Sequence, residues 1–353
     1  MSGTSNWFIV MLLQIFNLSE IFAGSGILIS SRSNIKVYWN IPTFQCRSFK
    51  MNFTEIAERY GIIQNDNDDF RGSRISILYD PGYFPAIMNE SGKMSLRNGG
   101  IPQSGNLETH LKIFQENITN LIPDEAFSGL GIIDFENWRP IYRQNFGTLV
   151  PYKTLSIQRE KFLHPFWPAS FIEAEAQKKF EFYGRIFMDQ TLALAKKLRP
   201  KAKWGYYAYP YCFNKSPKNT AKDCPKEVLD ENDRLHWLFR ETDLLVPSLY
   251  LNEKMSRKDK LEEIEGRINE AARIIRKKQQ IASITPYFWY KYQDTRKFLT
   301  KEDLKHSFSL LSNLRINGLI IWGSSNDVNS KAKCINMYNY LNDILGPILT
   351  NTL

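Results

Sequence analysis

The chain has 353 residues, a length that fits one large α/β domain or two ordinary ones. Hydrophobic residues make up 43% of it and charged residues 24%, which excludes a disordered chain and allows a large core. The net charge of +9 indicates either simple solubility or a polyanionic partner, and without basic runs, zinc-finger spacing or an RNA-binding signature we expect no nucleic acid.

The first 26 residues have the features of a secretory signal peptide. Trp7 to Phe16 is an apolar stretch, and the small residues Ala23 to Gly26 follow it. This stretch is too short to cross a bilayer, and no later segment reaches the roughly 18 apolar residues that a membrane span needs. We therefore expect residues 1–26 to be a signal peptide and residues 27–353 to form a secreted domain without a membrane span.

Short β-rich runs recur along the rest of the chain. Several of them are continuous apolar runs, as expected of parallel strands that are covered on both faces. The predicted strands are Lys36–Trp39, Ile75–Tyr79, Gly131–Phe135, Trp204–Tyr209, Leu244–Leu251, Ile281–Tyr287 and Gly318–Trp322.

Helical patterns lie between these strands. In Ser170–Leu198, apolar residues recur at steps of three and four, and the pattern stops before Pro200. A second helix, Lys301–Arg315, begins after Thr300, which together with Asp303 predicts a capping box. The other predicted helices are Leu107–Ile122 and Lys258–Lys278.

This alternation of strands and helices favours βα units and a parallel sheet. The first strand is not followed by a glycine-rich phosphate loop, so a nucleotide-binding, doubly wound sheet is disfavoured. About seven βα units fit a single-domain, distorted (β/α) barrel of about seven strands, related to the TIM barrel.

The four cysteines indicate two disulfides in a secreted chain, with three possible connectivities. The short separation favours Cys212 with Cys224, which leaves Cys46 with Cys334. The cysteine spacing does not fit a zinc site and only four histidines are present, so we expect no metal.

Four Asn-x-Ser/Thr sequons agree with secretion. Each triplet alone arises easily by chance, but together with a signal peptide they become credible acceptors. The candidate glycosylation sites are Asn52, Asn89, Asn117 and Asn214.

The segment Gly131-Ile-Ile-Asp-Phe-Glu-Asn-Trp-Arg-Pro carries the most chemical information. On a strand, alternate side chains share a face, so Asp134 and Glu136 point together while Phe135 points the other way. They stand at the C-terminal end of a predicted barrel strand, where such barrels have their active sites. Repulsion and burial raise the pKa of one carboxyl, which can then act as a general acid. Two solvated acids at a strand end are the alternative interpretation.

Aromatic and polar residues cluster at the ends of the other predicted strands. Tyr79-Asp80 follows one strand, Tyr250 and Trp322-Gly-Ser-Ser325 end two more, and Trp204-Gly-Tyr-Tyr-Ala-Tyr-Pro-Tyr-Cys212 forms another cluster. Core packing explains any one of these aromatic residues alone. Their repetition at one end of the barrel favours a cleft for a sugar chain.

Six motifs together resemble the animal hyaluronidases, and most of all the insect venom forms. The resemblance extends from about residue 36 to 348. The motifs are Asp134-Phe-Glu136-Asn-Trp-Arg-Pro, Val37-Tyr-Trp-Asn-Ile-Pro-Thr-Phe-Gln-Cys46, Leu78-Tyr-Asp-Pro-Gly82, Trp204-Gly-Tyr-Tyr-Ala-Tyr-Pro-Tyr-Cys212, Tyr290-Lys-Tyr-Gln-Asp294 and Ile321-Trp-Gly-Ser-Ser325.

This resemblance implies a role for each of several residues. Glu136 matches the proton donor of the family, and Asp134 matches the acid that holds the acetamido group of the substrate. The same two disulfides and a barrel of about seven strands are implied. Residues that match the lining of the cleft are Tyr207, Tyr250 and Trp322, with Tyr79, Asp80, Arg139 and Ser324 as further binding candidates.

The resemblance also implies a substrate and a mechanism. The substrate is hyaluronan, whose acetamido carbonyl attacks the anomeric carbon while Glu136 protonates the leaving oxygen, without a cofactor. We expect a monomer. A hydrolase that prefers chondroitin, or a non-catalytic paralogue that only binds hyaluronan, remains an alternative. For Arg139, an ion pair that holds the loop is as plausible as contact with the polyanion.

Overall fold

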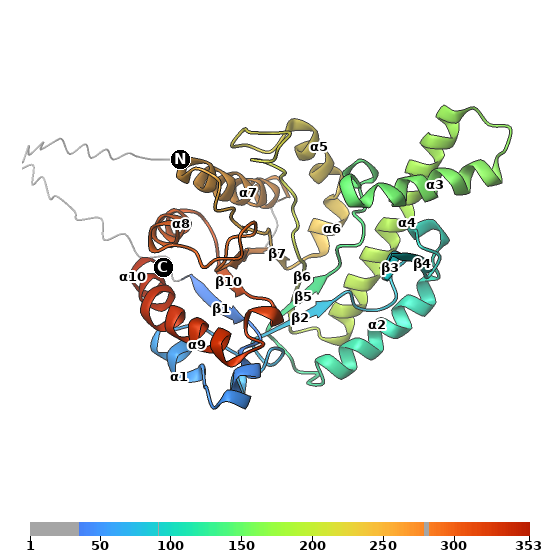
Figure 1. The fold of residues 1–353 in the computed structure, drawn as a ribbon. Coiled ribbons are helices and arrows are strands. Elements are labelled where there is room, and N and C mark those ends of the chain that lie inside the picture. The colour runs from blue at the N-terminus through green and yellow to red at the C-terminus, as the bar shows by residue number, and fades with distance from the viewer. Residues whose placement is uncertain (1–34, 91, 279–281) are drawn as a thin grey trace, which may run out of the picture. The chain divides into compact units, whose positions relative to one another are not determined.

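Short strands lie at the centre of the structure, and helices surround them (Figure 1). The computed structural model describes residues 35–90, 92–278 and 282–353, so the predicted signal peptide lies outside the described residues. The strands are β1 (Lys36–Asn40), β2 (Ile75–Tyr79), β3 (Ala86–Glu90), β4 (Lys93–Arg97), β5 (Leu130–Asp134), β6 (Lys203–Tyr206), β7 (Leu244–Leu245), β8 (Ser283–Ile284), β9 (Tyr287–Trp289) and β10 (Gly318–Trp322).

Parallel pairing orders these strands as in a barrel. β1 pairs with β10 and β10 with β9, β2 pairs with β5 and β5 with β6, and β7 pairs with β8. The bridges Tyr207–Val246 and Ser248–Tyr287 connect the ends of these ladders. In the described part of the chain, no ladder joins β1 to β2. The fold is the expected distorted (β/α) barrel, with its ring of hydrogen bonds open between those two strands.

Helices follow most of the barrel strands and cover them. The antiparallel hairpin of β3 and β4 and the helix Val150–Leu163, which packs on the helix Ala169–Leu198, are additions to the βα pattern. The helices are α1 (Thr54–Arg59), α2 (Leu107–Leu121), α3 (Val150–Leu163), α4 (Ala169–Leu198), α5 (Lys226–Arg234), α6 (His236–Glu241), α7 (Arg257–Lys278), α8 (Lys301–Asn313), α9 (Lys331–Tyr340) and α10 (Gly346–Thr352).

The apolar strand runs are buried on both faces, as the sequence predicts. Ile77 and Ile132 belong to a small cluster that unites residues of β2, β5, β7, β9 and β10, which is the interior of the barrel. Leu78 and Ile133, one residue further along, belong to the larger core between strands and helices. Alternate residues of one strand therefore build the two layers of the core.

Three predicted strands differ from the observed ones by more than one residue at an end. The prediction Leu244–Leu251 contains only β7, since Pro247 lacks the N–H that would extend a ladder. β6 ends earlier than predicted, because Ala208 has a φ of 69°, in the left-handed region that strands do not use. The prediction Ile281–Tyr287 is divided between β8 and β9, and Ile281 itself lies outside the described residues.

Only half of the predicted capping box at α8 forms. The hydroxyl of Thr300 accepts a hydrogen bond from the backbone N–H of Asp303, as expected. The carboxylate of Asp303 does not bond back to Thr300, because Lys260 Nζ at 2.7 Å and the Tyr292 hydroxyl at 2.5 Å donate to it instead. Tertiary contacts thus replace the second local bond.

Both expected disulfides are present. Cys46 and Cys334 join the segment after β1 to α9, with a separation of 288 residues, and Cys212 and Cys224 close a loop with a separation of 12. In the described residues no cysteine is free. The long disulfide ties the first barrel strand to the C-terminal helices.

Removing the long disulfide by Cys46→Ser with Cys334→Ser should lower the free energy of unfolding by about 5 kcal/mol, because it releases a very long loop in the unfolded chain. The matched pair Cys212→Ser with Cys224→Ser releases a short loop and should cost about 3 kcal/mol. Thermal melts of both variants by circular dichroism measure the difference. A smaller loss for the long loop than for the short one would contradict the entropic account.

Candidate active site

β5 brings two carboxylates to the edge of the barrel at which its parallel strands end. Ile133 and Phe135 are buried, and Phe135 stacks on Phe84 with 4.0 Å between ring centroids. Because Phe135 is anchored in the core, the alternation of the backbone turns Asp134 and Glu136 to the opposite face. The shared face that the sequence predicts for the two acids is therefore observed.

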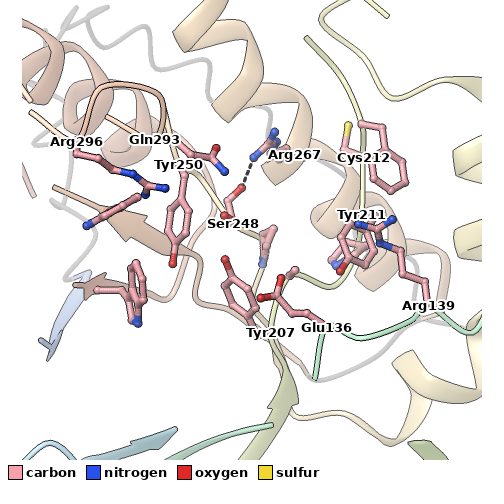
Figure 2. A pocket seen from close by; sticks show the side chains of 16 residues that line it. Glu136, Arg139, Tyr207, Tyr211, Cys212, Ser248, Tyr250, Arg267, Gln293 and Arg296 are labelled. Carbon is pink, nitrogen blue, oxygen red and sulfur yellow. Dashed lines mark hydrogen bonds between the residues drawn. The ribbon is translucent and has the colours of Figure 1, made fainter. Parts of the chain in front are cut away.

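Two cavities meet at Glu136, which lines both of them. The first cavity, of about 440 Å³, also includes Tyr207, Tyr250 and Trp322, and the carboxylate of Glu136 is directed toward Tyr207 in it (Figure 2). The second cavity, of about 390 Å³, includes Asp134. A carboxyl group placed between two hollows can act on a bond in the middle of a bound chain.

Burial raises the pKa of both carboxyl groups. For Asp134, burial followed by the charges of Glu136 and Asp80 raises the pKa to about 8. Burial also raises the pKa of Glu136, but the guanidinium of Arg139 opposes the shift. The sequence predicts one raised pKa in the pair and assigns the acid to Glu136, whereas in the structure burial raises the pKa of both carboxyl groups. The pair as a unit therefore holds a proton near neutral pH.

Replacing Asp134 by Asn should stabilise the folded protein near neutral pH. Its folded pKa lies above the unfolded value of about 3.9, so the folded state binds more protons and the parent loses stability as the pH rises from about 4 to about 8. Asn keeps the shape without ionising. The variant should gain on the order of 1 to 3 kcal/mol over the parent at pH 7.5 and almost nothing at pH 4. Melting temperatures at both pH values test this, and a variant that melts below the parent at pH 7.5 contradicts it.

Aromatic side chains form one wall of the first cavity. Tyr250 stacks on Trp322 with ring centroids 5.6 Å apart, and Tyr207 lies 6.3 Å from Tyr250. Burial raises the pKa of Tyr207 and of Tyr250 above the ordinary value, so both hydroxyls stay protonated and can donate hydrogen bonds. The structure thus brings together the three side chains that the sequence places in a sugar cleft.

Tyr79 joins the two cavities. Its side chain lines the second cavity, and its hydroxyl accepts a hydrogen bond from Trp322 Nε1 at 2.9 Å. Burial raises the pKa of Tyr79 to about 12, so the hydroxyl is neutral at physiological pH. The bond orients the indole of Trp322 at the mouth of the first cavity.

Arg139 lines the first cavity, and among the described residues no carboxylate forms the ion pair that the sequence left open as its role. Its Nη1 donates to the backbone carbonyl of Gln144 at 2.7 Å, and its Cζ lies 4.7 Å from the centre of the Tyr211 ring. The loop is therefore held by a backbone bond and cation–π contacts. The positive charge remains available to the cavity and to Glu136.

Asp80 faces the second cavity but is already paired. Two bonds of 2.6 and 2.8 Å join its carboxylate to the guanidinium of Arg97, which ties the β3–β4 hairpin to the end of β2. Its charge is one of those that raise the pKa of Asp134. Asp80 therefore shapes the site through its neighbours, whereas the sequence suggests direct contact.

Ser324, a candidate binding residue, caps a short helix after β10. Its hydroxyl accepts a bond from the backbone N–H of Asn326 at 3.2 Å and caps the short helix Ser325–Asp327. The residue does not belong to the lining of either cavity described above. A local backbone N–H thus uses one acceptor position of the hydroxyl that the sequence assigns to substrate.

Further side chains of the first cavity were not predicted. Arg267 reaches it from α7, where its Nη1 donates to the backbone carbonyl of Ser248 at 2.5 Å and its Nη2 to Glu263 (Figure 2). A charged residue inside a charged helix gives no sequence signal for this position. Trp289 ends a strand, as Trp322 does, so the same rule could have found it. The unpredicted lining includes Ser248, Arg267, Trp289, Gln293 and Arg296.

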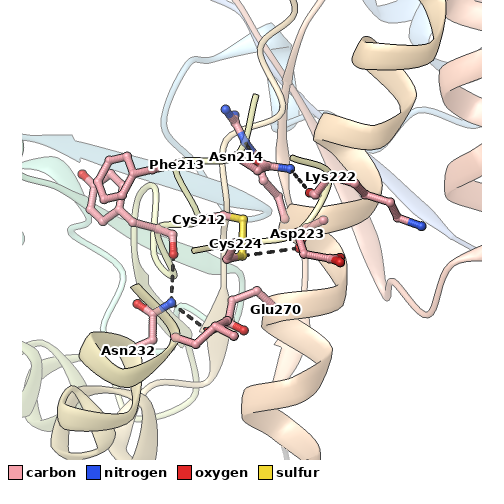
Figure 3. Close-up of a disulfide and its surroundings, with 12 residues drawn as sticks. Cys212, Phe213, Asn214, Lys222, Asp223, Cys224, Asn232 and Glu270 are labelled. Atoms are coloured by element: carbon pink, nitrogen blue, oxygen red, sulfur yellow. Dashed lines mark hydrogen bonds between the residues drawn. A yellow bond between two sulfur atoms is a disulfide. The ribbon is translucent and has the colours of Figure 1, made fainter. Parts of the chain in front are cut away.

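The structure corrects one of the four glycosylation sites. Asn52 and Asn89 are exposed and Asn117 is half-buried, but Asn214 is 1% exposed. Its Nδ2, the atom to which a glycan would be attached, donates at 2.7 Å to the backbone carbonyl of Lys222, beside the Cys212–Cys224 disulfide (Figure 3). It also donates to two backbone carbonyls of α7. The sequon at Asn214 is therefore inaccessible in the folded chain.

The described residues contain neither a group of metal ligands nor a membrane-spanning helix. Within the described ranges, no three His, Cys, Asp or Glu side chains are grouped as metal ligands would be. No helix in those ranges combines the length and the apolar character that crossing a membrane requires.

Comparison with known proteins gives consistent matches over nearly the whole chain. The family model described as hyaluronidase matches residues 26–353. A hyaluronidase of Apis mellifera is 48% identical over 314 residues, which are 88% of this chain and 82% of that protein. A hyaluronidase of Dolichovespula maculata is 46% identical, over 89% of this chain and 96% of its own.

A solved structure agrees with these sequence matches. The crystal structure of bee venom hyaluronidase in complex with a hyaluronic acid tetramer superposes with a TM-score of 0.88 at 47% identity. The match covers 90% of this chain and 99% of the other. An identity of 47% indicates a common family as well as a common fold.

Proposed function

The chain belongs to the hyaluronidase family of glycoside hydrolases, and on this premise we propose that it hydrolyses hyaluronan within the polymer. The bond cleaved is the β-1,4 bond between N-acetylglucosamine and glucuronate. The observation that carries the proposal is the position of Glu136 at the junction of two cavities, beside Asp134. A chain can extend in both directions from that point, which suits an endohydrolase.

Glu136 acts as the general acid and base in this proposal. Its raised pKa keeps a proton available for the leaving oxygen. A retaining glycosidase ordinarily needs a second carboxylate as nucleophile. Here the 2-acetamido carbonyl of N-acetylglucosamine attacks the anomeric carbon instead, and the bond to the leaving oxygen breaks as Glu136 protonates it. Water, deprotonated by Glu136, then opens the oxazolinium ring with net retention.

Asp134 orients the acetamido group and stabilises the charge that develops on it. One carboxyl oxygen accepts the acetamide N–H. Because the two acids share a proton near neutral pH, delivery of a proton from the pair leaves negative charge beside the forming oxazolinium. Tyr207, Tyr250 and Trp322 enclose the sugar ring, and the neutral hydroxyls of the two tyrosines can bond its polar groups.

We further propose secretion, by way of the predicted signal peptide. Two disulfides support it, since they persist in oxidising compartments. The net charge of +9 supports attraction of a polymer that carries one carboxylate in each disaccharide.

Counting new reducing ends from hyaluronan, chondroitin and a chitin-like polymer tests the function. The proposal expects the highest kcat/KM with hyaluronan. A higher value with chondroitin would move the substrate assignment to that polymer. Binding of hyaluronan without new reducing ends would show a non-catalytic paralogue.

A further inference from the structure

Arg296 places a positive charge in the first cavity. It lies on the loop after β9, and its Cζ lies 4.7 Å from the centre of the Trp289 ring, which lines the same cavity. Within the described residues, no carboxylate oxygen lies within 4.0 Å of the guanidinium nitrogens of Arg296, so Arg296 forms no ion pair there. The neighbouring cations do form ion pairs: Arg267 is paired with Glu263, and Lys297 with Glu253.

The loop holds this side chain in a defined position. The backbone N–H of Arg296 donates to the carbonyl of Tyr292 at 2.9 Å. The backbone N–H of Tyr292 in turn donates to the carbonyl of Lys297 at 2.9 Å. Arg296 has a φ of 62°, a conformation that is uncommon for any residue except glycine. A glycine or asparagine would fit this turn more easily, so the turn itself does not explain the arginine.

Two arginines flank the aromatic pocket. Both Arg296 and Arg139 line the first cavity, and Glu136, Tyr207 and Tyr250 lie between them in Figure 2. In hyaluronan every N-acetylglucosamine has a glucuronate on each side. A polymer with that sugar in the aromatic pocket therefore carries one carboxylate on each flank of the pocket.

We propose that Arg296 binds the uronate carboxylate on the flank of the pocket away from Arg139, and so selects acidic over neutral polymers. The assignment rests on the proposed function. A guanidinium that lies over an indole ring can keep its N–H edge free for a bidentate bond to a carboxylate. The exposed position of the loop lets the polymer enter without displacing a partner of Arg296.

Arg296→Gln tests the assignment, with Lys297→Gln as a matched loss of charge on the same loop. The KM for hyaluronan should rise about tenfold in Arg296→Gln, with kcat within about twofold, because a charge-assisted bond is lost. Lys297→Gln should keep the parent KM. Arg296→Lys should recover part of the loss. Hyaluronan with its carboxyls chemically reduced serves as a neutral competitor, and its inhibition constant should be equal for the parent and Arg296→Gln.

The other possible results contradict either the assignment to Arg296 or the proposed function. An unchanged KM in Arg296→Gln, or an equal rise in Lys297→Gln, removes the assignment to Arg296. A matching rise in the inhibition constant of the neutral competitor shows that Arg296 supports the loop and does not read charge. A parent that leaves hyaluronan intact overturns the proposed function itself, whereas an active parent with an unaffected variant overturns only this inference.

Discussion

Glu136→Gln is expected to lower kcat on hyaluronan by about three orders of magnitude while KM stays within about twofold of the parent value. Glutamine keeps the size of the side chain and its place between the two cavities, but it cannot deliver a proton to the leaving oxygen or take one from water. Counting reducing ends over a range of hyaluronan concentrations separates kcat from KM.

The control for this variant is Glu173→Gln on α4, which makes the same chemical change at an exposed position. It should cleave at the parent rate. Comparable melting temperatures of the variants and the parent exclude unfolding as the cause of a loss. If Glu136→Gln cleaves as fast as Glu173→Gln, Glu136 is not the acid and the mechanism proposed above is wrong.

Asp134→Asn should lower kcat by about two to three orders of magnitude. Asparagine can still accept the acetamide N–H, but it cannot carry the negative charge that stabilises the oxazolinium. The same variant is expected to be more stable than the parent near neutral pH, so a slow but stable enzyme would locate the loss in the chemistry.

Asp230→Asn on α5 provides the matched control, because Asp230 pairs with the exposed Lys226 at the surface. Kinetics and melts of the two variants at one pH complete the comparison. An Asp134→Asn variant within fivefold of the parent kcat would remove Asp134 from the mechanism.

The sequence predicts well those strands and helices in which the apolar residues are the buried ones. β2 and β10 have the predicted bounds, because predominantly apolar runs such as Gly318–Trp322 mark strands that are covered on both faces. Helix α3 was not predicted, because its buried positions include Ser156 and Glu160 and so give no apolar stripe. Glu160 is buried with Lys179 of α4 as a partner, which only the fold brings near.

The same distinction applies to the site. Asp134 and Glu136 are neighbours along one strand, so simple alternation finds them. Contacts between segments that are distant in the sequence decide the state of the other candidate residues. Arg97 forms an ion pair with Asp80, and α7 covers the side-chain amide of Asn214. Arg296 enters the cavity from a loop after β9 and carries no local signal of its role.

The anomer first formed at the new reducing end distinguishes retention from inversion at the anomeric carbon. Proton NMR of a hyaluronan oligosaccharide, recorded before mutarotation, distinguishes the two forms. Participation of the acetamido group, with Glu136 as acid and base, predicts the β-anomer first. An α-anomer formed first would show direct attack by water with inversion, and would contradict the roles proposed here for Glu136 and Asp134.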